Sequence, residues 1–111
     1  MRNGPITQGQ IEEEIMRLLS NLESDTEEFE VLAQRAAETE ATHKAMWAKA
    51  YLSADGSIRN REAVADLAMS DNLYQFKIAE ALVKAKREKL LSLRTSVDAL
   101  RTLTANVRAQ I

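Results

Sequence analysis

Cysteine is absent from the 111 residues, which hold only three glycines and one proline. Without cysteine the chain cannot form disulfides or use thiolate chemistry, which agrees with a cytoplasmic protein. After residue 9 there is one glycine, Gly56, and no proline, so long stretches lack the residues that break helices. Apolar residues make up 45% and aromatic residues 5%, a balance typical of helical coiled-coil proteins.

Several functional motifs are also missing. No run of about 18 apolar residues predicts a membrane span, and Met1–Gln10 lacks the apolar core of a signal peptide. We find no glycine-rich phosphate loop, no Ser-His-Asp order and no Cys-His metal spacing. We therefore predict a protein without enzymatic activity, metal or cofactor.

One turn signal, Ser53–Ser57 with Asp55-Gly56 at its centre, divides the helix-forming sequence. We expect an all-α fold, a long antiparallel two-helix hairpin in residues 9–111 with its turn at 53–58. Residues 1–8 are expected to form a flexible arm. A two-helix hairpin has no third layer, so each helix buries only one stripe. The remaining apolar surface predicts a homo-oligomer or a docked partner.

The first predicted helix starts near Thr7, which can cap it, and continues to about Leu52. Ser24 and Glu27 resemble a capping box, so a break within residues 21–26 is the alternative to an uninterrupted helix. Spacings of three and four indicate one inward face. Its apolar members are Ile11, Ile15, Leu18, Leu22, Phe29, Leu32, Ala36, Trp47 and Ala50.

The second predicted helix runs from Ile58–Arg61 to the C-terminus. Its second half follows a coiled-coil heptad with one polar interruption, formed by Leu90, Leu93, Val97, Leu100, Thr104, Val107 and Ile111. Its first half has a looser apolar seam, through Val64, Leu67, Tyr74, Ile78, Ala81 and Ala85.

Charge is unevenly distributed between the two helices. Residues 12–40 contain ten acidic and two basic residues, a net of −8, whereas residues 77–108 contain eight basic and three acidic residues, a net of +5. Folding at Gly56 sets the basic cluster Lys84–Lys89 opposite the acidic cluster Glu23–Glu30. Glu12–Glu14, in the first turns, are interpreted as favourable partners of the helix dipole and not as a metal site.

An arginine recurs every seven residues beside the heptad seam, at Arg87, Arg94, Arg101 and Arg108. Such flanking positions usually hold ion pairs between helices, although arginine also binds phosphate well. We favour assembly over nucleic acid for this stripe. The predicted residues of oligomerisation or helix pairing are Arg87, Leu90, Leu93, Arg94, Val97, Leu100, Arg101, Val107 and Arg108.

Trp47 and Tyr51 lie one helical turn apart among basic residues. Rings beside cations suit single-stranded nucleic acid, because bases stack on the rings and phosphates meet the cations. The alternative is that both rings belong to the core at the closed end of the hairpin. The candidate nucleic-acid-binding residues are Lys44, Lys49, Tyr51, Arg59 and Arg61. The single histidine, His43, has no neighbours that would form a catalytic group.

The segment Ala45-Met46-Trp47-Ala48-Lys49-Ala50-Tyr51-Leu52-Ser53-Ala54-Asp55-Gly56 resembles the UvsY-like recombination mediators of bacteriophages. The similarity extends loosely over residues 28–108. It implies a small helical protein that forms rings or barrels, binds single-stranded DNA, and helps a RecA-like recombinase displace the single-strand-binding protein. DNA contacts are implied at Lys49, Lys44 and Tyr51, whereas Asp55 stands where the family turn can be basic.

Two functions therefore remain open. One is a single-stranded DNA-binding recombination mediator with a recombinase and a single-strand-binding protein as partners. The other is a coiled-coil scaffold or adaptor without nucleic-acid binding. Both predict a homo-oligomer in the cytoplasm, which is the host cytoplasm if the chain is phage-encoded.

Overall fold

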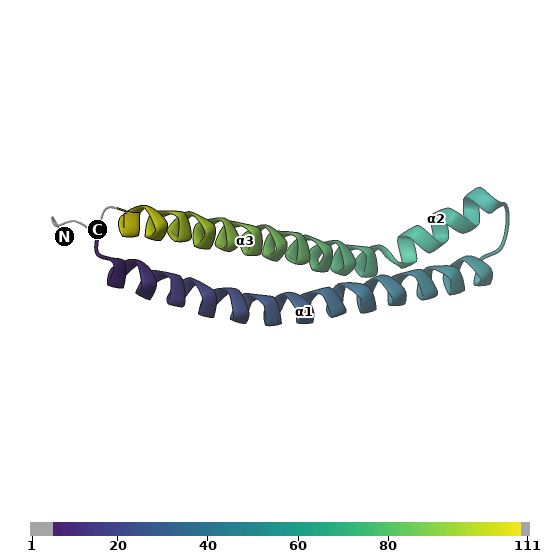
Figure 1. Cartoon of the computed structure of the whole chain (residues 1–111). Coiled ribbons are helices and arrows are strands. Elements are labelled where there is room, and N and C mark those ends of the chain that lie inside the picture. Colours follow the sequence, from purple (N-terminus) through teal and green to yellow (C-terminus); the bar gives the residue numbers. More distant parts are fainter. Residues whose placement is uncertain (1–5, 110–111) are drawn as a thin grey trace. The chain divides into compact units, whose positions relative to one another are not determined.

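The computed structural model describes residues 6–109, and these residues form helices without any β-strand. Helix α1 spans Gln8–Ser53, α2 spans Ile58–Ala68 and α3 spans Ser70–Ala109 (Figure 1). The predicted all-α class is confirmed. Of the predicted flexible arm, residues 1–5 lie outside the described residues.

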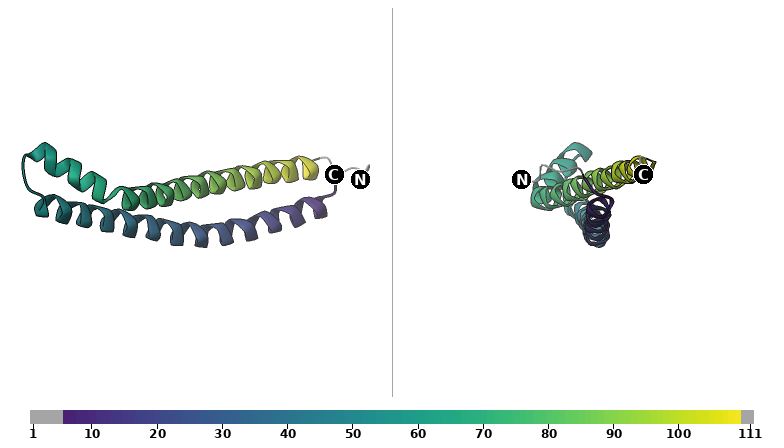
Figure 2. Two further views of the ribbon diagram at one scale, coloured as in Figure 1. Left: turned by 180° about the vertical axis from the view of Figure 1, so that it is seen from behind. Right: turned by 60° about the vertical axis from the view of Figure 1, so that its left-hand side comes forward.

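The helices contribute to two compact units. Unit 1 joins the described parts of Met1–Glu28 and Lys86–Ile111, and unit 2 is Phe29–Ala85. In unit 1 the beginning of α1 lies beside the far half of α3, seen as purple beside green and yellow in Figures 1 and 2. In unit 2, α2 and the beginning of α3 lie beside the second half of α1.

Helix α1 begins with a capping box, as its sequence predicts. The Gln10 N–H donates to the Thr7 hydroxyl at 3.2 Å, and the Thr7 N–H donates to the Gln10 side-chain oxygen at 2.9 Å. These two bonds satisfy backbone groups that have no partner within the helix. The alternative break within residues 21–26 does not occur, and the Thr26 hydroxyl instead donates to the Leu22 carbonyl at 2.7 Å inside the helix.

The turn between α1 and α2 depends on Gly56, whose φ is +98°. A side chain here would be strained, and a Cβ would lie 3.2 Å from the Asn60 side-chain nitrogen. Ser57 then caps α2 by accepting a hydrogen bond from the Asn60 N–H, while the Asn60 amide donates to the Asp55 carbonyl at 2.8 Å. Glycine, serine and asparagine thus close the loop through a left-handed backbone conformation and two hydrogen bonds.

The expectation of one continuous helix after the turn is wrong at Met69. Met69 has φ −104° and ψ +13° and separates α2 from α3. The Ser70 hydroxyl donates to the Leu67 carbonyl at 3.1 Å, and Asp71 lies in the first turn of α3. Short polar side chains at Ser70, Asp71 and Asn72 compete for backbone groups and favour helix ends over interiors.

Burial confirms the predicted inward face of α1 and the C-terminal heptad of α3, apart from Ile111, which lies outside the described residues. Ile11, Leu18, Leu90 and Val97 are buried, and the other predicted members are half-buried. The α1 stripe also contains polar members that the apolar pattern did not include, namely Asp25, Thr39 and His43.

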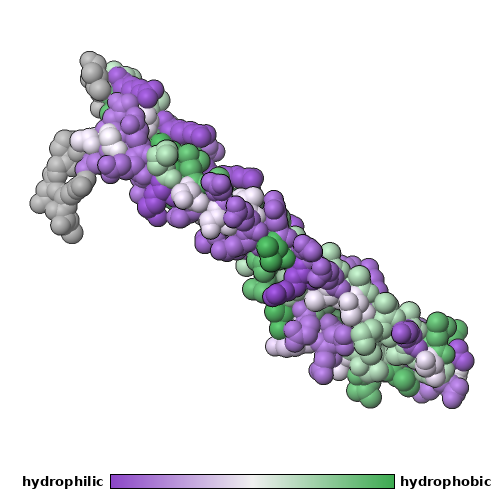
Figure 3. Space-filling view, turned by 90° about the horizontal axis from the view of Figure 1, so that it is seen from below, coloured by the Kyte–Doolittle hydropathy of each residue, from purple (hydrophilic) through white to green (hydrophobic). Residues whose placement is uncertain are grey.

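The looser seam predicted for the first half of the second helix is wrong. Its six members are all exposed, with Leu67 at 79% and Tyr74 at 64% of their full accessible area. The heptad of the second half instead continues backwards without a shift, through Lys86, Val83, Ala79, Phe76 and Asn72. Exposed large apolar residues therefore misled the prediction, since the observed seam also includes small and polar residues. Figure 3 shows hydrophobic residues exposed among hydrophilic ones on the face that it draws.

Truncation of a buried and of an exposed leucine tests this register. Leu90→Ala should lower the free energy of unfolding by about 2–5 kcal/mol, because it leaves a cavity in the seam. Leu67→Ala, at a position that the sequence assigned to the seam, should change it by less than about 0.5 kcal/mol. Chemical denaturation followed by circular dichroism measures both, and equal losses would contradict the observed register.

Candidate nucleic-acid interface

Trp47 and Tyr51 form a stacked pair on α1, with ring centroids 5.4 Å apart and planes at 16°. The Trp47 indole N–H donates to the Asp66 carboxylate on α2 at 2.9 Å. Both rings are half-buried. One part of the pair therefore helps to hold α2, while another part faces solvent.

The candidate cations differ in how available they are. Lys44 is exposed and forms an ion pair with Glu40 at 2.8 Å, and this ammonium group lowers the pKa of the Glu40 carboxyl. Lys49 and Arg59 are exposed and form no ion pair with any described residue. Arg61 is half-buried, and its Nε is buried without a hydrogen-bond partner among residues 6–109.

Helix geometry decides which of these cations share a side with the rings. Lys49 is two residues from each ring, and residues two apart do not share a helix face. Arg59 and Asp66 are seven residues apart, hence on one side of α2 at about two turns' separation. Because Asp66 contacts Trp47, Arg59 lies on the ring side of α2. We call Lys44, Trp47, Tyr51 and Arg59 the ring patch, and it excludes Lys49 and Arg61.

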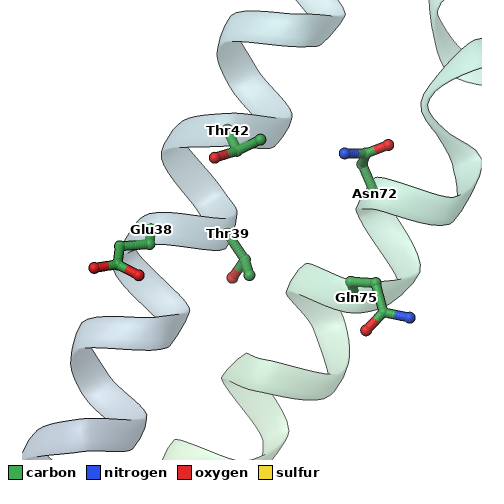
Figure 4. A pocket seen from close by; sticks show the side chains of 5 residues that line it. All are labelled: Glu38, Thr39, Thr42, Asn72 and Gln75. Carbon is green, nitrogen blue, oxygen red and sulfur yellow. The ribbon is translucent and has the colours of Figure 1, made fainter.

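Two hollows of about 250 and 260 Å³ lie along unit 2. The first, lined by His43, Lys44 and Trp47, leaves part of the indole accessible. The second is polar, and Figure 4 shows its lining by Glu38, Thr39 and Thr42 of α1 with Asn72 and Gln75 of α3. The Thr39 hydroxyl is already used, since it bonds to the Arg35 and Ala36 carbonyls at 3.0 Å.

His43 is a member of the helix-pairing stripe and has no catalytic neighbours. Its ring stacks on Phe76 with centroids 6.4 Å apart, and Lys77 Nζ lies 5.4 Å from the centroid of the same Phe76 ring. The Nδ1 atom is buried without a hydrogen-bond partner among the described residues. This arrangement gives His43 a packing role.

The expected meeting of acidic and basic clusters is confirmed in unit 1 for four residues. Asp25 is buried at 6% exposure and lies between two ammonium groups, with Lys86 at 3.2 Å and Lys89 at 3.0 Å. Lys86 also contacts Glu28 at 2.6 Å. The sequence identified the facing clusters but missed that Asp25 and Lys86 occupy the seam itself, which their heptad positions would have revealed.

These contacts shift the pKa values of both buried partners. Hydrogen bonds from Lys89 and then Lys86 hold the pKa of Asp25 below its usual value. Hydrogen bonds to Glu28 and then Asp25 raise the pKa of Lys86. Both shifts favour the charged forms of Asp25 and Lys86, so these two groups are ionised at neutral pH.

The heptad arginines are less well paired than predicted. All four are exposed, and Arg101 lies 3.9 Å from Asp98 of its own helix. Neither Arg94 nor Arg108 forms an ion pair with another described residue. The apolar members of the predicted pairing set, in contrast, lie buried or half-buried in the chain itself. They are Leu90, Leu93, Val97, Leu100 and Val107.

Comparison with known protein families, with curated proteins and with solved structures finds no match for this chain. Within residues 6–109, no helix is long and apolar enough to cross a membrane. The same residues contain no group of three or more His, Cys, Asp or Glu side chains placed to hold a metal ion.

The Asp25 cluster predicts a specific loss of stability in acid. The depressed pKa of Asp25 means that its stabilising contribution is present above its unfolded pKa, about 3.9, and is lost as the pH falls through its lower folded pKa. Asp25→Asn should therefore unfold more easily at pH 7 and lose less stability than the parent between pH 5 and pH 2. Thermal unfolding across this range measures the difference.

The matched control is Glu27→Gln, which removes an exposed carboxylate two residues away that forms no ion pair with a described residue. Its acid profile should follow that of the parent. A parallel profile for Asp25→Asn and the parent would show that the cluster does not stabilise the fold.

Proposed function

We propose that this chain is a non-enzymatic helical protein that binds single-stranded DNA through the ring patch and acts as a recombination mediator. The main observation in support of this proposal is the stacked Trp47–Tyr51 pair, which lies beside exposed cations on two helices. Stacked rings accept bases of any sequence, and nearby cations accept the phosphates. The resemblance of residues 45–56 to the UvsY-like family supports the mediator role.

Oligomerisation belongs to the same proposal. We infer an antiparallel hairpin of α1 against α2 and α3, and we propose that several hairpins associate. One ring patch offers few contacts and has Asp66 and Glu40 beside it. Several patches on one assembly would bind the same strand with a high effective concentration, which compensates for weak single sites. A recombinase and a single-strand-binding protein are the proposed partners.

A structural scaffold or adaptor without nucleic-acid binding is the second candidate. It is favoured by the hydrogen bond from the Trp47 indole to Asp66, which gives this ring a role inside the chain. It is also favoured by the pairing of Lys44 with Glu40, which reduces the positive charge near the rings. On this interpretation the exposed apolar residues of unit 2 contact a protein partner.

Substitutions on the ring side and the opposite side of α1 separate the candidates. Tyr51→Leu combined with Arg59→Ala should weaken binding of a single-stranded oligonucleotide, since one stacking ring is worth about 1–3 kcal/mol per base. The loss of one phosphate contact should also reduce the salt slope of log K by about 0.7. Lys49→Ala, which removes an exposed cation from the other side of the same helix, should bind nearly like the parent.

Trp47 fluorescence and oligonucleotide anisotropy, at low and then physiological salt, provide the measurement. Circular dichroism checks that each variant remains helical. Parent protein that fails to bind at micromolar concentration in low salt would select the scaffold. Equal affinities for the ring-side variant, the Lys49→Ala variant and the parent would rule out the ring patch as the DNA contact.

A further inference from the structure

One face of unit 1 has a ridge from each helix, and the two ridges carry opposite charge. The acidic ridge on α1 consists of Glu12, Met16 and Glu23, which spacings of four and seven place on one side of the helix. The basic ridge on α3 consists of Leu91, Arg94, Arg101 and Arg108. Spacings of three and seven again give one side.

Both ridges border the same hollow, which shows that they share a face. The hollow measures about 360 Å³ and is lined by Glu12 and Ile15 of α1 and by Arg101, Thr104, Ala105 and Arg108 of α3. Its floor is mostly apolar, because Ile15 and Ala105 contribute carbon atoms between the charged rims. A charged rim around an apolar floor is the usual arrangement of a protein interface.

Each ridge also exposes one large apolar side chain. Met16 is 67% exposed and Leu91 is 54% exposed, and no other residue of α1 or α3 within unit 1 is among the exposed large apolar residues of the described chain. Met16 has acidic neighbours along its ridge and Leu91 has arginine neighbours. The two ridges are therefore complementary in charge and each supplies one apolar anchor.

We propose that this face binds the same face of a second copy of the chain, giving a two-fold symmetric four-helix bundle. A two-fold axis parallel to the helices places the α1 ridge of each copy on the α3 ridge of the other, so that every contact occurs twice. Such an axis also leaves each residue at the same position along the helix direction in both copies. Within one copy, Glu12 lies at the same level along the helices as Arg101 and Arg108, because all three line the hollow. The axis therefore places Glu12 beside Arg101 and Arg108 of the second copy.

The other end of the interface follows from the Asp25 cluster. Asp25 contacts Lys86 and Lys89. Because α1 and α3 run in opposite directions in unit 1, Glu23, two residues before Asp25, lies level with the α3 residues that follow Lys89. These include Leu91 and Arg94. The same axis thus sets Glu23 against Arg94 of the second copy. Arg94 and Arg108, which form no ion pair with another described residue, thus meet carboxylates of the second copy.

A second copy fits this face better than a nucleic acid does. Arginines seven residues apart on a helix are about 10.5 Å apart, which matches carboxylates on another helix with similar periodicity. The face also carries Glu12 and Glu23, which would repel phosphates. This interface would supply the oligomer on which the proposed function rests, but it does not require DNA binding.

Charge reversal of each ridge gives a decisive test with the full-length protein. The first variant, Arg94→Glu with Arg101→Glu, makes both ridges acidic, and the second, Glu12→Arg with Glu23→Arg, makes both basic. Light scattering should show the parent at twice 12.4 kDa or a multiple of that mass, and each variant alone at 12.4 kDa. An equimolar mixture of the variants should recover the parental mass, because an acidic face then meets a basic one.

A matched control reverses charges on the outer side of the same helices. Glu13→Arg with Glu88→Arg changes the net charge as much as the second variant does, and it should keep the parental mass. Circular dichroism checks folding, and if a reversed variant does not fold, Met16→Lys with Leu91→Lys tests the same face through its apolar anchors and should give the monomer mass.

Three results would overturn the proposal. These are a monomeric parent, folded variants that retain the parental mass, and a mixture that remains monomeric. Unchanged mass with loss of oligonucleotide binding in the first variant would assign the arginines to a nucleic acid instead. Oligonucleotide anisotropy on the same samples reports the ring patch separately, so a failed interface and a failed DNA site are distinguishable.

Discussion

Two paired helices can bury only one stripe each, and the rest of this structure depends on that limit. Among the described residues seven are buried, and one of the seven is a carboxylate, Asp25. The stripe therefore buries few apolar side chains, so helix caps, the turn and ion pairs must also help to define the fold. The same limit explains the shallow hollows. The function proposed for this chain accordingly uses exposed side chains and not an enclosed pocket.

The charges inside the stripe specify which residues meet. A shift of one heptad between α1 and α3 would bring Asp25 opposite an apolar position and leave a buried charge without a partner, which costs far more than a lost apolar contact. Lys86 prevents this by contacting both Asp25 and Glu28. A single polar position commonly fixes register in coiled coils at some expense of stability. Apolar residues supply the attraction between the helices, and the ionic cluster selects one alignment.

Local chemistry explains what was predictable. The Thr7 and Gln10 cap, the turn at Gly56 and the heptad from Leu90 onward follow from residue types at fixed spacings, and all are observed. The first half of the second helix was not predictable from apolar residues alone, because Ala79 is buried and Asn72 is half-buried while Leu67 and Tyr74 are exposed. Extending the heptad across polar positions would have found it. The break at Met69 and the placement of Lys49 away from the rings also have local causes, namely the polar residues that follow Met69 and the spacing of two residues between Lys49 and each ring.

The separation of the two surfaces into different units has a functional consequence. The ring patch belongs to unit 2, whereas the charged ridges belong to unit 1, so the proposed interface between copies uses no residue of the ring patch. The net charge of −2 gives no general attraction to phosphate, and a single ring patch must therefore bind weakly. Doubling the patches converts the second contact with a strand into an intramolecular event, which raises affinity without any new residue. In the proposed mediator, DNA binding therefore depends on assembly, and the residues of the charged ridges control it as directly as the residues that touch the strand.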